Sequence, residues 1–478
     1  MTWPTVNEVA LILLQVTITI IIATGLLQNA LYMLQLWLAL RSLRINRPER
    51  RLGLLWRRYA ELSPPVALLL PAFNEERSIV DSLRSMLAMN YPSFEVIAIN
   101  DGSTDATLAA LIEAFELEPV QRSYEEAIQH QPILGLYRSR IDPKLLVIDK
   151  GRGGKADALN AGINLSRAPI FCAIDADSIL ESDALLRAVR PFIDEPTRMA
   201  AVGGTIRIAN GCRVDAGRVT GIGLPRNMLA LFQTVEYLRA FLMARLAWSR
   251  LKTLTIISGA FGLFRRQVVV DIGGYTLGTV GEDFDLVVKI HRHFRDRREE
   301  YAITFVPQPV CWTEAPESWR VLGRQRSRWQ RGALETFFRN KDMLFRPRYG
   351  RIGTLGFGHV LLVDVIGPPV EVLGYMLVPL MWALGLLAPE YLLAYLALTF
   401  VYGIFVSVSS LILEEIELQR YPRARDLLIL TTAAVLENFG YRQVNNLWRG
   451  ASGSSFGASR AGASCLALAS SRADLGLG

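Results

Sequence analysis

The strongest constraint on the fold is a stretch without any charged side chain, residues 9–40. A bilayer core about 30 Å thick needs about 20 apolar residues of helix, so this stretch is long enough to span a membrane. It does not read as a secretory signal, because no basic region precedes it and no small-residue cleavage site closes it. Arginines follow from Arg41 to Arg58, and the positive-inside rule places them in the cytoplasm. We therefore expect residues 1–58 to form a transmembrane helix and a basic juxtamembrane segment.

Composition and later apolar runs extend this expectation. The 478 residues are 51% hydrophobic and 20% charged, and their mean hydropathy is +0.25. These values exclude disorder, a coiled coil and an ordinary soluble enzyme. Apolar runs at residues 372–389 and 391–413 predict a membrane hairpin, and a shorter run at 427–436 predicts a third C-terminal span. We expect C-terminal transmembrane helices over residues 351–450 and a disordered tail over 451–478.

The middle of the chain has a different texture. Residues 59–315 alternate short β-branched runs with helical patterns, which is typical of an α/β domain with a largely parallel sheet. Strands are expected at residues 66–70, 96–99, 145–148 and 170–174. Ligands of open α/β sheets bind beyond the carboxyl ends of strands. The polar segments that follow these strands are therefore the candidate site.

The segments after the first three strands suit a nucleotide diphosphate. Asn74 follows the first strand, and on the residues alone it is interpreted as part of a helix N-cap with acidic residues in the first turn. Asp101 follows the second and could either hydrogen-bond a base or ribose or make an Asp-Gly turn. The third strand leads into a glycine-rich loop that ends at Lys155, where a helix begins. That arrangement suits a diphosphate but lacks the Walker pattern, because no Ser or Thr follows the lysine.

The fourth strand ends in two carboxylates, Asp175 and Asp177. Side chains two residues apart on an extended segment point the same way, so both can face one hard cation. Mg²⁺ or Mn²⁺ shared with substrate phosphates is the expected guest. A single Asp-x-Asp is common and indicates nothing alone. It indicates a cation site here because it follows a strand, as the other polar segments do.

Two later motifs add candidate residues. Glu282 and Asp283 lie in a glycine-bounded loop, which is either solvated surface or the source of a general base for an acceptor hydroxyl. Gln325, Arg328 and Trp329 lie in a basic helical stretch. Residues 316–350 are expected to form an amphipathic interfacial helix on anionic lipid.

In this order and spacing the motifs resemble those of the membrane-bound family 2 glycosyltransferases, which include cellulose, hyaluronan, chitin and poly-N-acetylglucosamine synthases. The resemblance covers residues 60–445 and is nearest to bacterial poly-N-acetylglucosamine synthase-like proteins, through residues 153–160 and 325–332. It implies an α/β GT-A domain, a nucleotide-diphospho-sugar transferase fold, inserted between transmembrane helices. It also implies a multi-pass protein of the bacterial inner membrane with its catalytic domain in the cytoplasm.

The resemblance further implies roles for single residues. The implied donor contacts are Ala72, Phe73, Asn74 and Asp101 at the uridine, Lys155 at the diphosphate, Asp175 near the sugar or ribose, and Gln325 and Arg328 at the leaving diphosphate. Asp177, with Asp175 beside it, would hold Mg²⁺ or Mn²⁺. Asp283 of the Glu282–Asp283 pair would be the general base, and Trp329 would face the acceptor sugar. The implied reaction is inverting transfer from a UDP-sugar.

Three functions stay open at this point. The chain is a processive polysaccharide synthase with export, a non-processive transferase that adds one sugar to a membrane lipid, or a binding or scaffold protein that kept the fold. Intact carboxylates argue against the third. Glu371, Glu437 and Asn438 either line a polymer path or lie in the headgroup region. Because few spans are expected, self-association or an export partner is the alternative to a single-chain channel. No nucleic-acid partner is expected.

Overall fold

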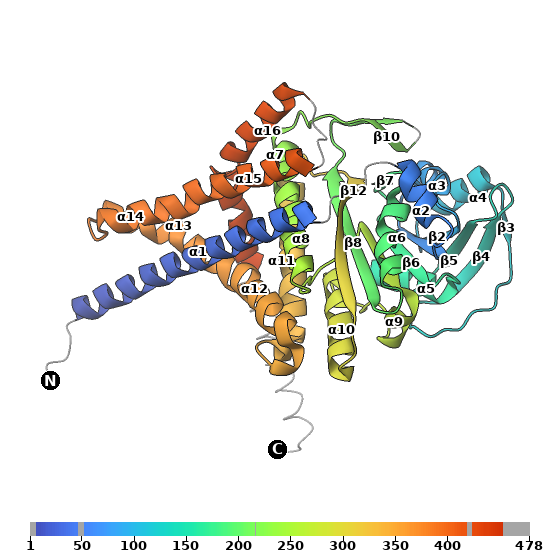
Figure 1. Ribbon diagram of the computed structural model, residues 1–478, viewed down its shortest axis with the longest axis horizontal. Coiled ribbons are helices and arrows are strands. Elements are labelled where there is room, and N and C mark those ends of the chain that lie inside the picture. Colours follow the sequence, from blue (N-terminus) through green and yellow to red (C-terminus); the bar gives the residue numbers. More distant parts are fainter. Residues whose placement is uncertain (1–5, 46–51, 216, 418–422, 453–478) are drawn as a thin grey trace, which may run out of the picture.

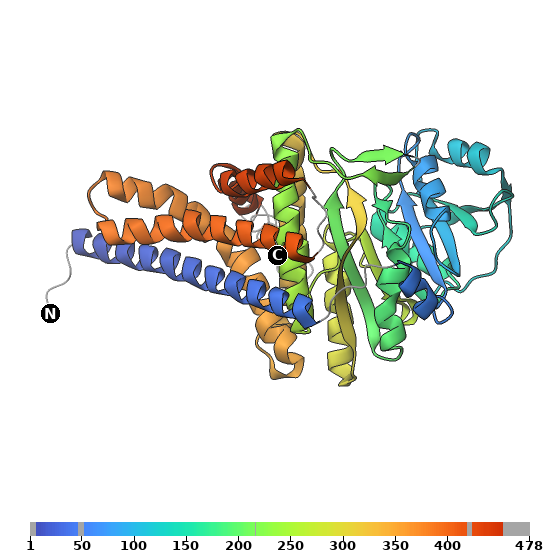
Figure 2. The same cartoon turned by 45° about the horizontal axis from the view of Figure 1, so that its top comes forward.

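The computed structural model describes residues 6–45, 52–215, 217–417 and 423–452. An α/β part holds the main sheet, and a group of long helices extends away from it (Figure 1). The turned view in Figure 2 shows the same two parts, with α1, α13 and the continuous helix of α14 and α15 side by side in the extension. The expected α/β GT-A-like fold with apolar helices on both sides of it in the sequence is confirmed.

The main sheet has ten strands in the order β3-β4-β5-β2-β1-β6-β11-β8-β12-β7. In chain order these are β1 (Val66–Ala72), β2 (Phe94–Asp101), β3 (Leu117–Pro119), β4 (Ile133–Ser139), β5 (Leu145–Lys150), β6 (Ile170–Ile174), β7 (Ile179–Leu180), β8 (Met199–Ile208), β11 (Phe261–Arg265) and β12 (Ala302–Thr313). The short strands β9 (Arg213–Asp215) and β10 (Arg218–Gly221) form a separate antiparallel pair.

Strand direction decides where the site lies. Strands β5, β2, β1 and β6 are neighbours and run parallel. Their carboxyl ends therefore meet at one edge of the sheet, which is where ligands of open α/β sheets bind. The four strands predicted from the sequence are all present, and residues 66–70 of β1 are fully buried. Continuous apolar runs form such strands because helices cover both faces of a parallel sheet.

Helices of the α/β part complete its layers. They are α2 (Leu52–Tyr59), α3 (Ile79–Leu87), α4 (Thr107–Phe115), α5 (Lys155–Leu165), α6 (Ala184–Asp194), α9 (Arg266–Asp271), α10 (Glu282–Arg297) and α11 (Trp319–Arg339). Helix α5 packs on β1 and β2, and α6 packs on β8 and β12. Helix α11 packs against α10 and against a turn of the helical extension, so the expected interfacial helix is also held by protein on two sides.

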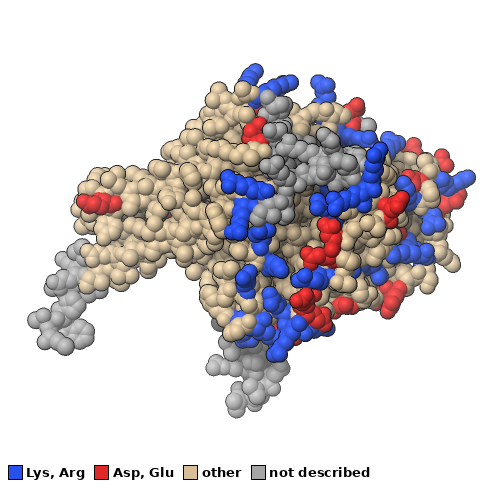
Figure 3. Space-filling model, in the orientation of Figure 1, with Lys and Arg blue, Asp and Glu red and all other residues tan. Residues whose placement is uncertain are grey.

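Three helical segments among the described residues are long and apolar enough to cross a membrane. They are Ile12–Arg44, Ile352–Ala383 and Pro389–Ile416. The first lies in α1 (Val6–Ile45), the second joins η4 (Ile352–Gly356), α12 (Phe357–His359), η5 (Val360–Ile366) and α13 (Gly367–Ala383), and the third joins α14 (Pro389–Leu396), η6 (Ala397–Val401) and α15 (Tyr402–Glu417). In Figure 3 the extension is almost free of charged side chains, except for an acidic patch at its tip.

The structure differs from two of the expected spans. The hairpin is present, but its first helix begins at Ile352 and includes Asp364, whose carboxylate pairs with Arg449 at 2.8 Å. The run at 427–436 lies in α16 (Ala424–Leu436), which has 13 residues. At 1.5 Å per residue this helix is about 20 Å long, too short for the hydrocarbon core. Most of the expected tail, residues 453–478, lies outside the described residues, as do Arg47, Arg50 and Arg51 of the juxtamembrane segment.

A long helix within the α/β part also contacts the extension. It runs through α7 (Met228–Tyr237), η1 (Leu238–Arg245) and α8 (Leu246–Arg250), and it packs against α1, α15 and α16. Arg239 of η1 donates to Glu437 at 2.5 Å and to the hydroxyl of Ser407 at 2.7 Å. The two parts are therefore joined by buried charge pairs rather than by a linker alone.

Glu437, one of the polar residues singled out from the sequence, lies at this contact, and Glu371 is bonded to other residues of the helical extension. Glu437 and Asn438 are buried, at 2% and 0% exposure. Glu371 accepts hydrogen bonds from the hydroxyl of Tyr375 at 3.1 Å and from the amide of Asn446. These groups are bonded within and between helices, and their depth in a membrane stays a prediction.

Candidate active site

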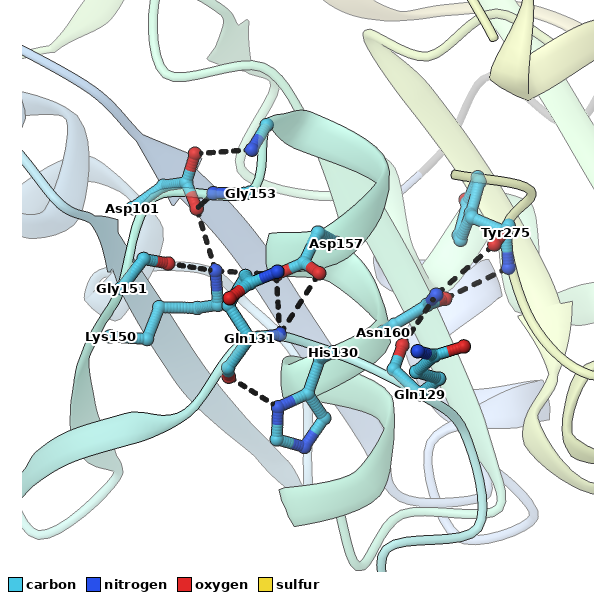
Figure 4. A network of polar contacts seen from close by, with 11 residues as sticks. Asp101, Gln129, His130, Gln131, Lys150, Gly151, Gly153, Asp157, Asn160 and Tyr275 are labelled. Carbon is cyan, nitrogen blue, oxygen red and sulfur yellow. Dashed lines mark hydrogen bonds and ion pairs between the residues drawn. The ribbon is translucent and has the colours of Figure 1, made fainter. Parts of the chain in front are cut away.

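The segments after β2 and β5 form one buried polar network, drawn in Figure 4. The Asp101 carboxylate accepts a hydrogen bond from Lys150 Nζ at 2.7 Å, from the Gly153 amide at 2.9 Å and from the Gly154 amide at 2.7 Å. Lys150 is fully buried and also pairs with Asp157 at 2.5 Å. A buried lysine needs such partners, because an uncompensated charge in the interior is costly. Asp101 thus supports the glycine-rich loop, and its contact with a uridine stays a prediction.

Close contacts require glycine in this loop and at Gly102, which packs against the loop from the segment after β2. A Cβ on Gly153 would lie 2.3 Å from Cγ of Asp157, and a Cβ on Gly102 would lie 2.9 Å from the Arg152 amide nitrogen. Gly154 has a φ of 89°, a backbone conformation that side chains disfavour. The loop is therefore held tightly between Asp101 and Asp157, with α5 starting at its end.

Phe73 and Asn74 lie beside the same loop. The Arg152 guanidinium stacks on the Phe73 ring, 3.2 Å from its centroid. The side-chain oxygen of Asn74 accepts a hydrogen bond from the Thr104 backbone amide at 2.9 Å. The backbone amide of Asn74 donates to the Ser103 hydroxyl at 3.0 Å. The contacts join the segments after β1, β2 and β5, and they leave an aromatic ring and a guanidinium that suit a flat base.

Lys155 lies at the centre of the acidic residues. Its ammonium pairs closely with Asp175 and is 4.0 Å from a Glu282 oxygen. Burial lowers the pKa of Lys155, but Asp175 and Glu282 raise it more, to about 12. The lysine is therefore charged at neutral pH. Lys155, Asp175 and Glu282 come from three separate segments, which the fold brings together.

Asp177 lies at the exposed rim next to this cluster. Partial removal from water, Asp175 and Glu75 raise the pKa of Asp177 to about 6. The Asp177 carboxylate has no ion-pair partner among the described residues, so a cation would relieve the repulsion between the two carboxylates. The described chain contains no group of three or more His, Cys, Asp or Glu side chains at metal-binding distance. Two carboxylates fit a divalent cation whose remaining ligands are phosphate and water oxygens.

Asp283 is held in a fixed orientation at the start of α10. Its Oδ2 accepts a hydrogen bond from the Gly259 amide at 3.1 Å, and its Oδ1 accepts from the Phe284 amide at 2.8 Å. Lys155 Nζ also reaches the Gly259 carbonyl at 3.4 Å. Burial and the neighbouring Asp283 raise the pKa of Glu282. The acid pair therefore faces the lysine rather than forming a solvated surface loop.

The motif residues on helix α11 differ in their exposure to solvent. Arg328 and Trp329 are exposed, and Gln325 is half-buried. Arg326, which the sequence analysis passed over, is buried, pairs with Glu236 at 2.7 Å and stacks on Trp329 at 4.4 Å. It holds the tryptophan in place. The signal that could have identified it is its helical spacing from the buried Leu322 and Gln330.

The same helix is fastened to the acid pair. Glu335 accepts hydrogen bonds from the Thr279 hydroxyl at 3.2 Å and from the Val280 amide at 3.3 Å. A Cβ on Gly281 would lie 2.9 Å from the backbone of Gly332. Sequence analysis identified neither contact, because both depend on how α11 packs on the loop before α10.

The chain is similar to known proteins in sequence and in fold. Residues 67–273 match the model of the family described as glycosyl transferase family 2. The poly-beta-1,6-N-acetyl-D-glucosamine synthase of Staphylococcus epidermidis is 28% identical over 275 residues, which are 58% of this chain and 56% of that protein. The enzyme of the same name from Staphylococcus aureus strain COL is 29% identical over 276 residues, again 58% and 56%. The chain thus spans little more than half the length of these curated relatives.

A solved structure shares the fold over a greater length. The mannosyltransferase PcManGT from Pyrobaculum calidifontis, determined in complex with GDP-Man and Mn²⁺, is 20% identical and has a TM-score of 0.56, and the similarity covers 90% of this chain and 99% of that one. The fold is the mixed α/β, GT-A-like fold of that structure. Residues 67–273, which match the glycosyl transferase family 2 model, lie beside helices that are long and apolar enough to span a membrane.

Proposed function

We propose that this protein transfers an N-acetylhexosamine from a UDP-sugar to a growing polysaccharide at the inner face of a bacterial membrane. The observation that carries the proposal is the gathering of Lys155, Asp175, Glu282 and Asp283 at the carboxyl edge of a family 2 glycosyltransferase domain. The names of the staphylococcal relatives support the sugar and the polymer. The arginines that follow α1 support a cytoplasmic position for the domain.

The donor side of the site stabilises a leaving diphosphate. Negative charge grows on the diphosphate as the glycosidic bond breaks, and preorganised positive groups act where that charge develops. Lys155 is charged at neutral pH and lies at the start of α5, so it is placed for this task. Gln325 and Arg328 are proposed to close over the same group from α11. A divalent cation held by Asp177 and Asp175 would neutralise part of the phosphate charge.

The acceptor side removes a proton. Asp283 is proposed as the general base that takes the proton of the acceptor hydroxyl, and its two amide contacts fix where its oxygens point. Trp329, held by Arg326, is proposed as the platform for the acceptor sugar. Attack from the side opposite the leaving diphosphate inverts the anomeric carbon in one displacement, so no carboxylate nucleophile is needed.

Repeated addition and export are part of the proposal. The buried polar residues around Arg239, Glu437 and Glu371 lie where the catalytic part meets the membrane helices, which supports a polar path for a chain. Three candidate spans leave room for self-association or an export partner. Addition of one sugar to a membrane lipid is the competing function, and product size separates the two.

The test uses purified protein in nanodiscs with a panel of radiolabelled UDP-sugars. We expect UDP release only with Mg²⁺ or Mn²⁺ and a ladder or high polymer as product. Asp283→Asn should abolish turnover and keep donor binding, whereas Asp81→Asn, the same change on an exposed helix, should leave both unchanged. A single labelled lipid would replace the polymer proposal with the lipid one. Wild-type turnover in Asp283→Asn would overturn the base assignment.

A further inference from the structure

A groove lies where α1 meets the α/β part. It has a volume of about 620 Å³, and its walls are the last turns of α1, helices α6 and α8, and the first half of β12. Ser249 of α8 makes the wall rigid, because its hydroxyl contacts the Thr304 hydroxyl at 3.1 Å and accepts from the Phe305 amide at 3.1 Å.

The groove is separate from the active site. Its β12 wall begins at Ala302, which pairs with Met199 at the amino end of β8. Strand β8 runs in the same direction as β6, because both are antiparallel to β11. Asp175 follows the carboxyl end of β6, so the beginning of the groove and the carboxylates lie toward opposite edges of the sheet.

The groove opens at the end of a candidate membrane span. Ser42 and Leu43 line it, and the span in α1 ends at Arg44. One turn earlier the Arg41 guanidinium lies 5.5 Å from the Trp37 ring, a pairing of residue types that anchor helices at the membrane surface. If α1 crosses the bilayer as proposed above, the groove lies at the depth of the lipid headgroups.

The rim of the groove carries an excess of positive charge. Its basic residues are Arg187, Arg190, Arg198, Arg250 and Lys252, and its acidic residues are Asp194 and Glu195. Arg187, Arg190 and Arg198 are paired with carboxylates. The side chains of Arg250 and Lys252 have neither an ion pair nor a hydrogen bond within the described parts of the chain. Two cations are therefore available to an anionic ligand.

The floor of the groove is apolar. Leu43, Leu246, Ile303 and Phe305 form it, and each is at most 5% exposed. Apolar lining residues below a basic rim suit an amphiphile, which brings an anionic group and an apolar part to the same groove.

We propose that this groove binds the phosphodiester headgroup of an anionic phospholipid of the inner leaflet, with Arg250 and Lys252 as its charge partners. The lipid would join α1 to α8 and β12 and so hold the catalytic part against the membrane. The basic residues of such sites attract anionic lipids of the cytoplasmic leaflet. The inference rests on the proposed membrane span of α1 and is independent of sugar transfer.

The test measures lipid retention and needs no substrate. Full-length protein is placed in nanodiscs of phosphatidylcholine with or without phosphatidylglycerol, and lipids that stay bound are counted by native mass spectrometry. Arg250→Gln combined with Lys252→Gln should retain about tenfold less phosphatidylglycerol than the wild type. The control pair Arg138→Gln and Arg140→Gln removes the same charge from the β4 side of the sheet and should match the wild type.

Three further results test the role of charge, the kind of ligand and the location of the site. The charge-preserving pair Arg250→Lys and Lys252→Arg should keep retention, which separates loss of charge from loss of folding. Inorganic phosphate should not displace the lipid; displacement by it would show a site for a soluble phosphate and overturn the lipid proposal. Equal retention by the Gln pair and the control pair would overturn the site itself. Because sugar transfer is not measured, these outcomes are distinct from those of the proposed function.

Discussion

Gly332 of α11 touches Gly281 through bare backbone: a Cβ added at Gly332 would lie 2.8 Å from the Gly281 Cα. Gly281 directly precedes Glu282 and Asp283, so this contact sets how far α11 stands from the acid pair. Glu335 fastens the same loop one turn further along α11. The base and the acceptor platform of the proposed reaction are thus placed relative to each other by two glycines and one glutamate.

Gly332→Ala should therefore lower turnover much more than it lowers donor binding. The added methyl group forces α11 away from the loop, and a misplacement of about 1 Å in a catalytic site costs about 100-fold in rate. Initial rates of UDP release would be compared with donor affinity. Gly358→Ala is the matched control, because the nearest atom to its Cβ lies 3.9 Å away. Equal rates in the two variants would contradict the role of the contact.

Lys155→Met should reduce kcat by about 100-fold to 1,000-fold, the loss that follows removal of one preorganised group from developing charge. Lys155 holds its charge at neutral pH because Asp175 and Glu282 surround it. Single-turnover rates at saturating UDP-sugar measure the effect. Lys341→Met removes an exposed lysine and should leave the rate unchanged. A variant of Lys155 that changes only KM would instead show a role confined to donor binding.

Asp101→Asn should destabilise the fold as well as the loop. Breaking a buried ion pair costs about 3 kcal/mol, because it leaves a charge in the interior with one partner fewer. Lys150 would keep Asp157 but lose Asp101, and the amides of Gly153 and Gly154 would lose a charged acceptor. Chemical unfolding of the purified protein measures the loss, and UDP affinity should fall with it.

An exposed ion pair provides the control for Asp101→Asn. Glu118 and Arg140 are 3.3 Å apart with side chains 60% and 64% exposed. Glu118→Gln should cost about 0 to 1 kcal/mol, as exposed pairs do. If both substitutions cost the same, the buried network of Figure 4 is not a support of the loop.

His291 should make stability depend on pH. Burial lowers the pKa of His291 to about 4 in the folded protein, where the Nδ1 accepts from the Tyr301 hydroxyl and the Nε2 donates to the Leu254 carbonyl. In the unfolded chain its pKa is about 6.5, so the unfolded state binds more protons between these values. Stability is therefore lost as pH falls, by about 2 kcal/mol between about pH 7 and pH 5 from this residue alone.

His291→Gln should flatten that part of the curve. The melting temperature would be recorded between neutral and mildly acidic pH for the wild type, for His291→Gln and for His293→Gln, whose side chain is more exposed. A slope in His291→Gln equal to that of the wild type would show that other groups govern the acid sensitivity.

Local patterns were sufficient to predict four strands of the main sheet. The strands β1, β2, β5 and β6 were predicted because each is a continuous buried run followed by polar residues. The start of the hairpin at Ile352 was not predicted, because a charged residue such as Asp364 is not expected in a span unless its partner Arg449 is known. Charge pairs between residues far apart in sequence carry no local signal.

The same limit applies to the site. Asp101, Lys155, Asp175, Asp177 and the acid pair were candidates by residue type and position after a strand or before a helix. Lys150 and Arg326 were not, because their importance lies in the charges that surround them: Asp101 and Asp157 for the lysine, Glu236 for the arginine. Their neighbours come from other segments of the chain.

The sequence by itself determined the class of the molecule: an α/β domain with polar strand ends, flanked by apolar helices, because periodicity, charge gaps and strand-end residues are local properties. Tertiary structure alone decided which charges are paired and which are available. Asp101 is occupied by Lys150 and two loop amides, Asp177 has no ion-pair partner among the described residues, and α11 reaches the acid pair only where two glycines meet. Pairing and close approach depend on distances across the fold, and those are set by packing.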